Sequence, residues 1–243
     1  MTSELEILFS EIRKFNAYPA GIERICGDVP GNIFFPGGPG IFNAENGMIS
    51  NREIMVVGPQ FDSNLNFNKL HGWQEHWLRM TPPWHTLLLL LVNGGVDPER
   101  CFFTNVILGT KLRPESGIRN RKKRKFDVNT KKYFMEHCRS LFRLELEIQK
   151  PKVILVLGVV AAKFLCSFHP RLYEWSVIRT IKEADQQVLS VMESVPLTEN
   201  SSPTLVLLVN PVGRHANIAR RRFGEYRGNE AEVKMIVSAV SSP

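Results

Sequence analysis

A short apolar run that ends in a polar turn and a row of cations is the first feature of this chain that could do chemistry. Residues 204–209, TLVLLV, lead into Asn210-Pro211-Val212-Gly213 and then into the basic stretch RHANIARRR. A buried strand that delivers a polar turn and a cationic helix start to one place is a common anion site in α/β proteins. Most such turns are only turns, so a site is indicated only if other polar groups converge there.

Three other apolar runs end in a comparable way. Residues 53–58, EIMVVG, lead into GPQFDS; residues 100–108, RCFFTNVIL, contain the single amide Asn105; and residues 152–158, KVILVLG, end at Gly158. Short β-branched runs that are closed by glycine or proline are typical of buried strands in a parallel sheet. Ligands bind such sheets at the carboxyl ends of the strands. The four ends together therefore form the candidate site.

Segments with helical spacing lie between and around these strands and must position their ends. They cover residues 4–15, residues 86–92, a helix capped by Asp127 or Asn129 that ends at Pro151, residues 159–167 and residues 226–240. Strand and helix alternate four times, which predicts an α/β protein with three layers, α/β/α, around a central four-stranded parallel sheet. Residues 176–199 are ambiguous and could hold an edge strand or a hairpin.

We expect one domain of residues 1–243. Its first part, residues 1–50, combines the N-terminal helix with a Gly/Pro-rich loop, and residues 51–243 form the core. The four cysteines, Cys26, Cys101, Cys138 and Cys166, are widely spaced, which favours free thiols of an intracellular protein over a disulfide framework or a metal site. The N-terminus does not have the plan of a signal peptide, and the longest apolar run, residues 87–92, is too short to span a membrane. The expected protein is a soluble monomer of the cytoplasm or the nucleus.

The charge of the chain favours a polyanionic partner. The net charge is +7, and residues 119–125, RNRKKRK, include Arg121, Lys122, Lys123 and Arg124. A loop that binds DNA phosphates is the simplest interpretation of this run. A localisation signal or a plain solvated loop has the same sequence, so both stay open.

The order and spacing of these segments resemble the uracil-DNA glycosylase superfamily, and most of all its family-four branch, over residues 53–240. FFTNVILGTKLRP resembles "ITNVVKCRPP", QKPKVILVLGVVAAKFL resembles "RPKVILALGATAAQALLG", and MTPPWHTLLLLL resembles "GRPFVGRAG" with the helix that follows it. LVLLVNPVGRHANIARR occupies the place of "HPSxxxR". The resemblance implies a DNA glycosylase of base excision repair, which flips uracil or another deaminated base out of single- or double-stranded DNA and hydrolyses its N-glycosidic bond.

The resemblance also implies roles for residues near the first two strands. Asn105 would contact the uracil edge, since its amide offers both a donor and an acceptor; a buried asparagine satisfied by backbone is the alternative. Trp84 would stack on the flipped base, with Trp73, Trp77 and Phe61 as competitors and a core position as the alternative.

In the turn after the first strand the family has "GEAPG", and Gly58 is retained. Pro59 and Phe61 would line the pocket, and Gln60 stands at the position that binds the attacking water. The nearest carboxylate is Asp62, which could act as a base or merely form the turn.

The last turn departs from the family, because Asn210 stands where a histidine is usual. Asn210 would donate a hydrogen bond to the departing base, with His215 as a substitute from the neighbouring loop. Residues 212–216 would form the wedge that enters the minor groove, with Arg214 as the filler, and Arg220 and Arg221, followed by Arg222, would lie on phosphates. A solvated basic helix face is the alternative for these arginines.

Two residue types that are missing from the expected places limit the chemistry. Family-four enzymes hold a four-iron four-sulfur cluster on four cysteines with a close pair, which this chain lacks, so we expect no metal and no cofactor. None of the four strand ends carries a lysine, so a Schiff-base mechanism is not indicated. A catalytically inactive nucleic-acid-binding protein on the same fold is the alternative function, and a small-molecule α/β enzyme with basic loops is a third and weaker one.

Overall fold

The central feature of the fold is a five-stranded sheet in the order β3-β2-β5-β7-β6. It is seen in a computed structural model that describes residues 4–23, 53–60, 82–111 and 128–241. The strands are β2 (Ile54–Gln60), β3 (Cys101–Ile107), β5 (Val153–Leu157), β6 (Val191–Met192) and β7 (Thr204–Leu208). The first three and β7 run parallel, and β6 pairs antiparallel with β7 at the edge.

This sheet confirms the predicted α/β class and all four predicted parallel strands. The predicted number of strands was one too low, because β6 completes the sheet. It lies inside residues 176–199, where the sequence allows an edge strand or a hairpin, and its two residues are too few to give an alternating pattern.

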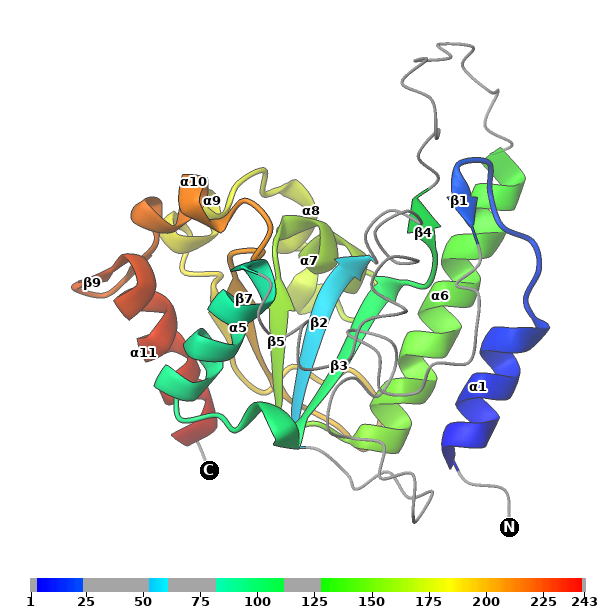
Figure 1. Ribbon diagram of the computed structural model, residues 1–243, viewed down its shortest axis with the longest axis horizontal. Helices are drawn as coiled ribbons and strands as arrows, with labels where there is room; N and C mark the ends of the chain where they lie inside the picture. The colour runs from blue at the N-terminus through cyan, green and yellow to red at the C-terminus, as the bar shows by residue number, and fades with distance from the viewer. Residues whose placement is uncertain (1–3, 24–52, 61–81, 112–127, 242–243) are drawn as a thin grey trace.

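Helices cover both faces of the sheet, as Figure 1 shows. One face packs against α6 (Val128–Gln149), α7 (Val159–Leu165), α8 (Glu174–Val177) and α9 (Ile181–Gln186), and α1 (Glu4–Lys14) lies on α6. The other face packs against α5 (Pro82–Asn93) and α11 (Gly228–Ser241). The predicted helices thus exist, with ends that differ by a few residues; α5 starts earlier because prolines are tolerated in a first helical turn.

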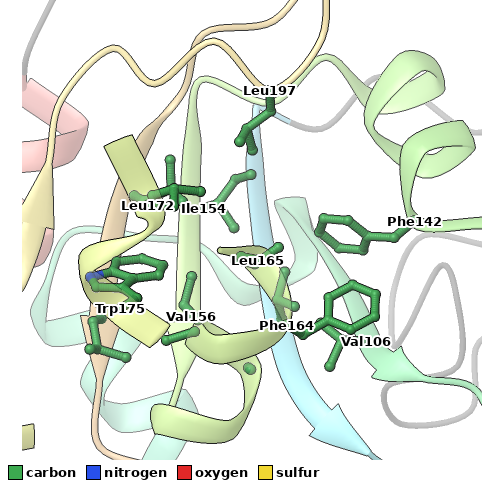
Figure 2. Packing of buried hydrophobic residues seen from close by; sticks show 14 of the residues in the cluster. Val106, Phe142, Ile154, Val156, Phe164, Leu165, Leu172, Trp175 and Leu197 are labelled. Carbon is green, nitrogen blue, oxygen red and sulfur yellow. The ribbon is translucent and has the colours of Figure 1, made fainter. Parts of the chain in front are cut away.

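Two apolar clusters form the core, one on each face of the sheet. Figure 2 shows the first, in which Phe142, Phe164 and Trp175 from three helices surround Ile154 and Val156 of β5. The alternate residues of the same strand belong to the second cluster, together with α5 and α11. Every residue of β5 and β7 is buried, and all of them except Thr204 are apolar, as expected for parallel strands covered on both faces.

Short elements complete the described chain. β1 (Ile22–Glu23) pairs antiparallel with β4 (Thr110–Lys111), and single 3-10 turns occur at η1 (Pro98–Arg100), η2 (Pro170–Leu172) and η3 (Ile218–Arg220). After β7 the chain forms α10 (Arg214–Asn217) and a hairpin of β8 (Arg222–Phe223) and β9 (Tyr226–Arg227). The last helix, predicted from residue 226, therefore begins two residues later. Within the described part of the chain, no helix has the length and apolar character needed to cross a membrane.

Candidate active site

The carboxyl ends of the parallel strands meet at one edge of the sheet, as predicted. Gly58 of β2 is the register partner of Asn105 of β3. At the other side, the Gly158 amide following β5 donates to the Leu208 carbonyl of β7 at 2.8 Å. β2 and β5 are themselves paired in parallel, so the four ends form one continuous row (Figure 1).

Asn105 is nearly buried, with 4% of its surface exposed. Side chains alternate along β3: Phe103 faces the α5 side, Thr104 bonds to Glu145 on the α6 side, and Asn105 therefore faces the α5 side again. The strand thus directs the amide of Asn105 to the same face of the sheet as α5.

Trp84 lies on that same face, in the first turn of α5, but it is a core residue. It is 5% exposed, and its ring centroid is 5.1 Å from that of Phe103. This burial agrees with the core position given as the alternative for Trp84 and does not favour stacking on a flipped base. The helix begins two residues before Trp84, and the apolar spacing that follows draws the indole inward.

The turn after β2 is described only in part. Gly58 is buried, and Pro59 and Gln60 are half-buried residues at the end of the strand, with Gln60 opposite Ile107. Pro59 has no amide hydrogen to donate, which is compatible with a strand end where regular pairing stops. Phe61 and Asp62 lie outside the described residues, as do Arg121, Lys122, Lys123 and Arg124.

Asn210 forms the turn after β7. Its side-chain oxygen accepts a hydrogen bond from the Val212 amide at 2.9 Å, the geometry of an Asx turn. Gly213 follows with a left-handed φ of 84° and starts α10. The amide nitrogen of Asn210 has no acceptor among the described residues, so this side chain keeps a donor at the edge of the sheet.

Gly158 makes room for this turn. Its φ is 86°, and a Cβ at this position would lie 3.0 Å from the Cβ of Asn210. Glycine is therefore required twice, by the backbone conformation and by the close approach of the two strand ends. The position of Asn210 at the end of β7 therefore depends on a glycine at the end of β5.

Arg214 does not project as a wedge. It is 6% exposed, and its guanidinium forms an ion pair with Glu232 of α11 and donates to the Asn229 carboxamide oxygen at 2.9 Å. The other oxygen of Glu232 accepts from the Val209 amide at 2.6 Å. The prediction for Arg214 was therefore wrong: the side chain turns inward and fixes the turn. Val212 of the same loop is exposed instead, at 76%.

Arg221 is likewise interior, which corrects its predicted place on phosphates. It is 0% exposed and donates to Asp185 at 2.9 Å and to the Leu207 carbonyl at 2.6 Å, while its Nε lies 3.1 Å from Glu232. Burial lowers the pKa of this guanidinium, and the carboxylates of Glu232 and Asp185 oppose that shift. His215 and Arg220 are exposed, in agreement with a surface role.

Sequence reasoning missed Glu232 and Asp185. One signal was present, because Glu232 stands within the apolar stripe of the last helix, beside Ala231, Met235 and Ile236. A carboxylate on a buried helix face requires a cation nearby. No comparable signal marks Asp185 as the partner of Arg221, since 36 residues separate them.

The described cysteines do not fit an iron-sulfur cluster. Cys101, Cys138 and Cys166 are free thiols; Cys101 lies in the cluster on the α5 face and Cys138 in the cluster on the α6 face. The sheet therefore separates these two sulfurs, so they cannot share one cluster. Among the described residues, no group of three or more His, Cys, Asp and Glu could hold a metal ion.

The layered sheet and its row of polar strand ends define an α/β protein with a site at the carboxyl edge. A family model described as the uracil DNA glycosylase superfamily matches residues 38–220, well over half of the chain and all four strand ends. The protein therefore belongs to the uracil DNA glycosylase superfamily, which confirms the resemblance. No curated protein matches the chain significantly.

Proposed function

We propose that the protein is a monofunctional DNA glycosylase that removes uracil or another deaminated base from DNA by hydrolysis. The observation that carries this proposal is the row of Gly58, Asn105, Gly158 and Asn210 at one sheet edge. Two amide side chains lie there, and Gly158 allows the turn that carries Asn210 to approach the end of β5. The family supplies the general reaction, and these residues supply a means of recognising a base.

In this proposal Asn105 recognises the Watson–Crick edge of the flipped base. Its amide can donate to O4 and accept from N3–H of uracil, a pattern that a nearly buried asparagine holds in fixed orientation. Gln60 orients the attacking water, and Asp62 is the candidate base. Phe61, Trp73 and Trp77 remain as aromatic candidates for stacking now that Trp84 lies in the core.

Asn210 completes the reaction at the leaving group. Because its oxygen is used by the Val212 amide, its nitrogen is oriented to donate to the base oxygen where negative charge develops. An asparagine lacks the positive charge of a protonated histidine, so the reaction should be slower than in relatives with histidine. Val212 replaces Arg214 as the proposed wedge, because it is a large, exposed apolar residue of this loop.

DNA is the proposed partner. Arg121, Lys122, Lys123, Arg124, His215 and Arg220 are the proposed contacts to its backbone, and single- and double-stranded substrates both stay open. An intracellular monomer remains our proposal for the state in which the protein acts.

The test is base excision from oligonucleotides that carry uracil, hypoxanthine, xanthine or thymine opposite guanine, and uracil in single strands. Alkali-labile sites should appear with at least one of them. Asn210→Asp keeps the acceptor for the Val212 amide but removes the donor, so it should lower kcat about 10²–10³-fold while leaving thermal stability near that of the wild type. Asn210→Ala removes both the acceptor and the donor, so it should lower both kcat and thermal stability.

An alternative is favoured by one observation, the asparagine in place of histidine at position 210. If no substrate yields an abasic site while salt-sensitive DNA binding persists, the protein is an inactive nucleic-acid-binding member of the family. Full activity of Asn210→Asp would instead show that excision does not use the amide donor.

A further inference from the structure

The β8–β9 hairpin has two chemically different faces. Phe223 and Tyr226 are opposite each other in its register; Phe223 packs against the core cluster of α5 and α11, and the Lys234 ammonium lies 5.0 Å from the Tyr226 ring centroid. Arg222 and Arg227 form the next pair, and both are exposed. Successive residues of a strand alternate between faces, so the aromatic pair faces the protein and the arginine pair faces solvent.

The arginine pair places two like charges directly opposite each other, which is electrostatically unfavourable. Residues directly opposite in an antiparallel ribbon have Cβ atoms about 4.5–5.5 Å apart, and like charges there destabilise the ribbon. Arg220 adds a third exposed cation just before the hairpin. Within the described part of the chain, none of these three side chains forms an ion pair or hydrogen bond, including with Glu225 in the turn.

Buried contacts hold the hairpin in place despite this repulsion. Asp185 of α9 accepts from the Arg221 guanidinium with one oxygen and from the Arg222 amide with the other, at 2.9 and 2.8 Å. The Gly228 amide donates to the Arg221 carbonyl at 3.2 Å, and Gly224 forms the turn with a left-handed φ of 57°. The interior Arg221 therefore fixes a ribbon whose flanking arginines point outward.

We propose that this arginine face, formed by Arg222 and Arg227 with Arg220 beside them, binds the phosphate backbone of duplex DNA outside the base pocket. Phosphate oxygens would neutralise the facing cations, and guanidinium groups match phosphate in planar, bidentate geometry. The inference rests on the proposed function, since the arginine face would be a second contact surface for the same DNA. The hairpin follows the Asn210 turn by about ten residues, and Figure 1 shows it on the side of the molecule where α10 lies.

The test measures binding to an undamaged duplex of about 20 base pairs by fluorescence anisotropy between 50 and 200 mM salt. Each lost phosphate contact lowers the slope of log K against log salt by about 0.9. Arg222→Ala/Arg227→Ala should therefore flatten the slope by about 1.8. Over this fourfold change in salt the wild type should lose about 12-fold more affinity than the double variant.

The matched control is Arg100→Ala/Lys150→Ala, which removes the same charge from exposed positions at the amino edge of the sheet. It should leave the slope within about 0.3 of the wild type, as expected when no phosphate contact is lost. A thermal melt of each variant checks that the fold is intact. An unchanged slope for the hairpin variant, an equal change in the control, or wild-type binding without salt dependence would overturn the proposal. Because undamaged DNA is used, failure of base excision would refute the proposed activity and leave this result standing.

Discussion

Glu145 is the described carboxylate with the clearest electrostatic cost. It projects from α6 into the core, where one oxygen accepts from the Thr104 hydroxyl at 3.0 Å and the other has no hydrogen-bond partner among the described residues. Burial raises its pKa from 4.5 to about 8, although the Thr104 bond acts in the opposite direction. Thr104 immediately precedes Asn105, so this pair braces the strand that carries the proposed base-recognition residue.

Stability should therefore depend on pH through Glu145. The pKa of Glu145 is higher in the folded state than in the unfolded state. The stability that comes from its protonated form is therefore fully present below about pH 4.5 and is lost as pH rises toward 8. The slope approaches about 1.4 kcal/mol per pH unit within that window. Glu145→Gln keeps an acceptor for Thr104 and removes the titration, so its free energy of unfolding should change less between pH 5 and pH 8.

Urea unfolding at pH 5, 6.5 and 8 measures this difference. Glu147→Gln, on the exposed face of the same helix, is the control and should follow the wild-type pH profile. Parallel profiles for wild type and Glu145→Gln would show that the carboxylate does not titrate in this range.

At the scale of elements, the buried ion pairs join parts of the chain that the sequence separates. Arg221 contacts Asp185 of α9, the carbonyl of Leu207 in β7 and Glu232 of α11, and Glu232 in turn holds the Val209 amide next to Asn210. Removing one partner from a buried ion pair leaves the other charge uncompensated. The network thus ties the stability of the fold to the position of the last turn.

Arg221→Ala should lower the free energy of unfolding by about 3–5 kcal/mol, because it leaves two buried carboxylates without this cation. The neighbouring arginines provide the controls. Arg220→Ala and Arg222→Ala remove exposed side chains and should change the free energy of unfolding by less than about 0.5 kcal/mol. Chemical denaturation of the three variants under one condition gives the comparison. Equal losses for all three would contradict the interior role of Arg221.

The close approach of β5 and β7 leads to a second prediction about elements. Gly158→Ala introduces strain at a positive φ and places a methyl group 3.0 Å from the Asn210 Cβ. Gly95→Ala also places a side chain at a positive φ, 76°, but there is open space around it. Each variant should lose roughly 1–3 kcal/mol of stability from backbone strain, with the larger loss at Gly158, whose ψ of 164° puts it in a region nearly restricted to glycine. Only Gly158→Ala should also reduce base excision, by displacing the turn.

Melting curves and single-turnover excision by the two glycine variants separate these effects. If Gly95→Ala reduces excision as strongly as Gly158→Ala, the loss reflects general destabilisation and not the contact with Asn210.

The elements show which parts of the structure the sequence could predict. The four parallel strands were predictable because burial on both faces makes their sequences predominantly apolar, and their polar ends mark the sheet edge. The orientation of Arg214 and Arg221 was not, because a row of arginines looks the same whether it faces solvent or buried carboxylates. The decisive partners, Asp185 and Glu232, come from other elements, and only the folded chain brings them together.

At the scale of the whole molecule, the two apolar clusters share the same strands. Ile154 and Val156 of β5 pack in the cluster of α6 and α7, while Val153, Leu155 and Leu157 pack in that of α5 and α11. β7 alternates in the same way. If the strands lose their order in one cluster, the packing of the other cluster is therefore lost as well.

This arrangement predicts that the described layers unfold as one cooperative unit, in keeping with the single domain expected from the sequence. Leu165→Ala opens a cavity in the cluster on the α7 side, and Leu91→Ala opens one on the α5 side; both leucines are fully buried. Each change should lower the free energy of unfolding by about 2–5 kcal/mol. Because the strands are shared, circular dichroism and tryptophan fluorescence should give one coincident urea transition in each variant. Separate midpoints in either variant would show that the two faces of the sheet can unfold independently.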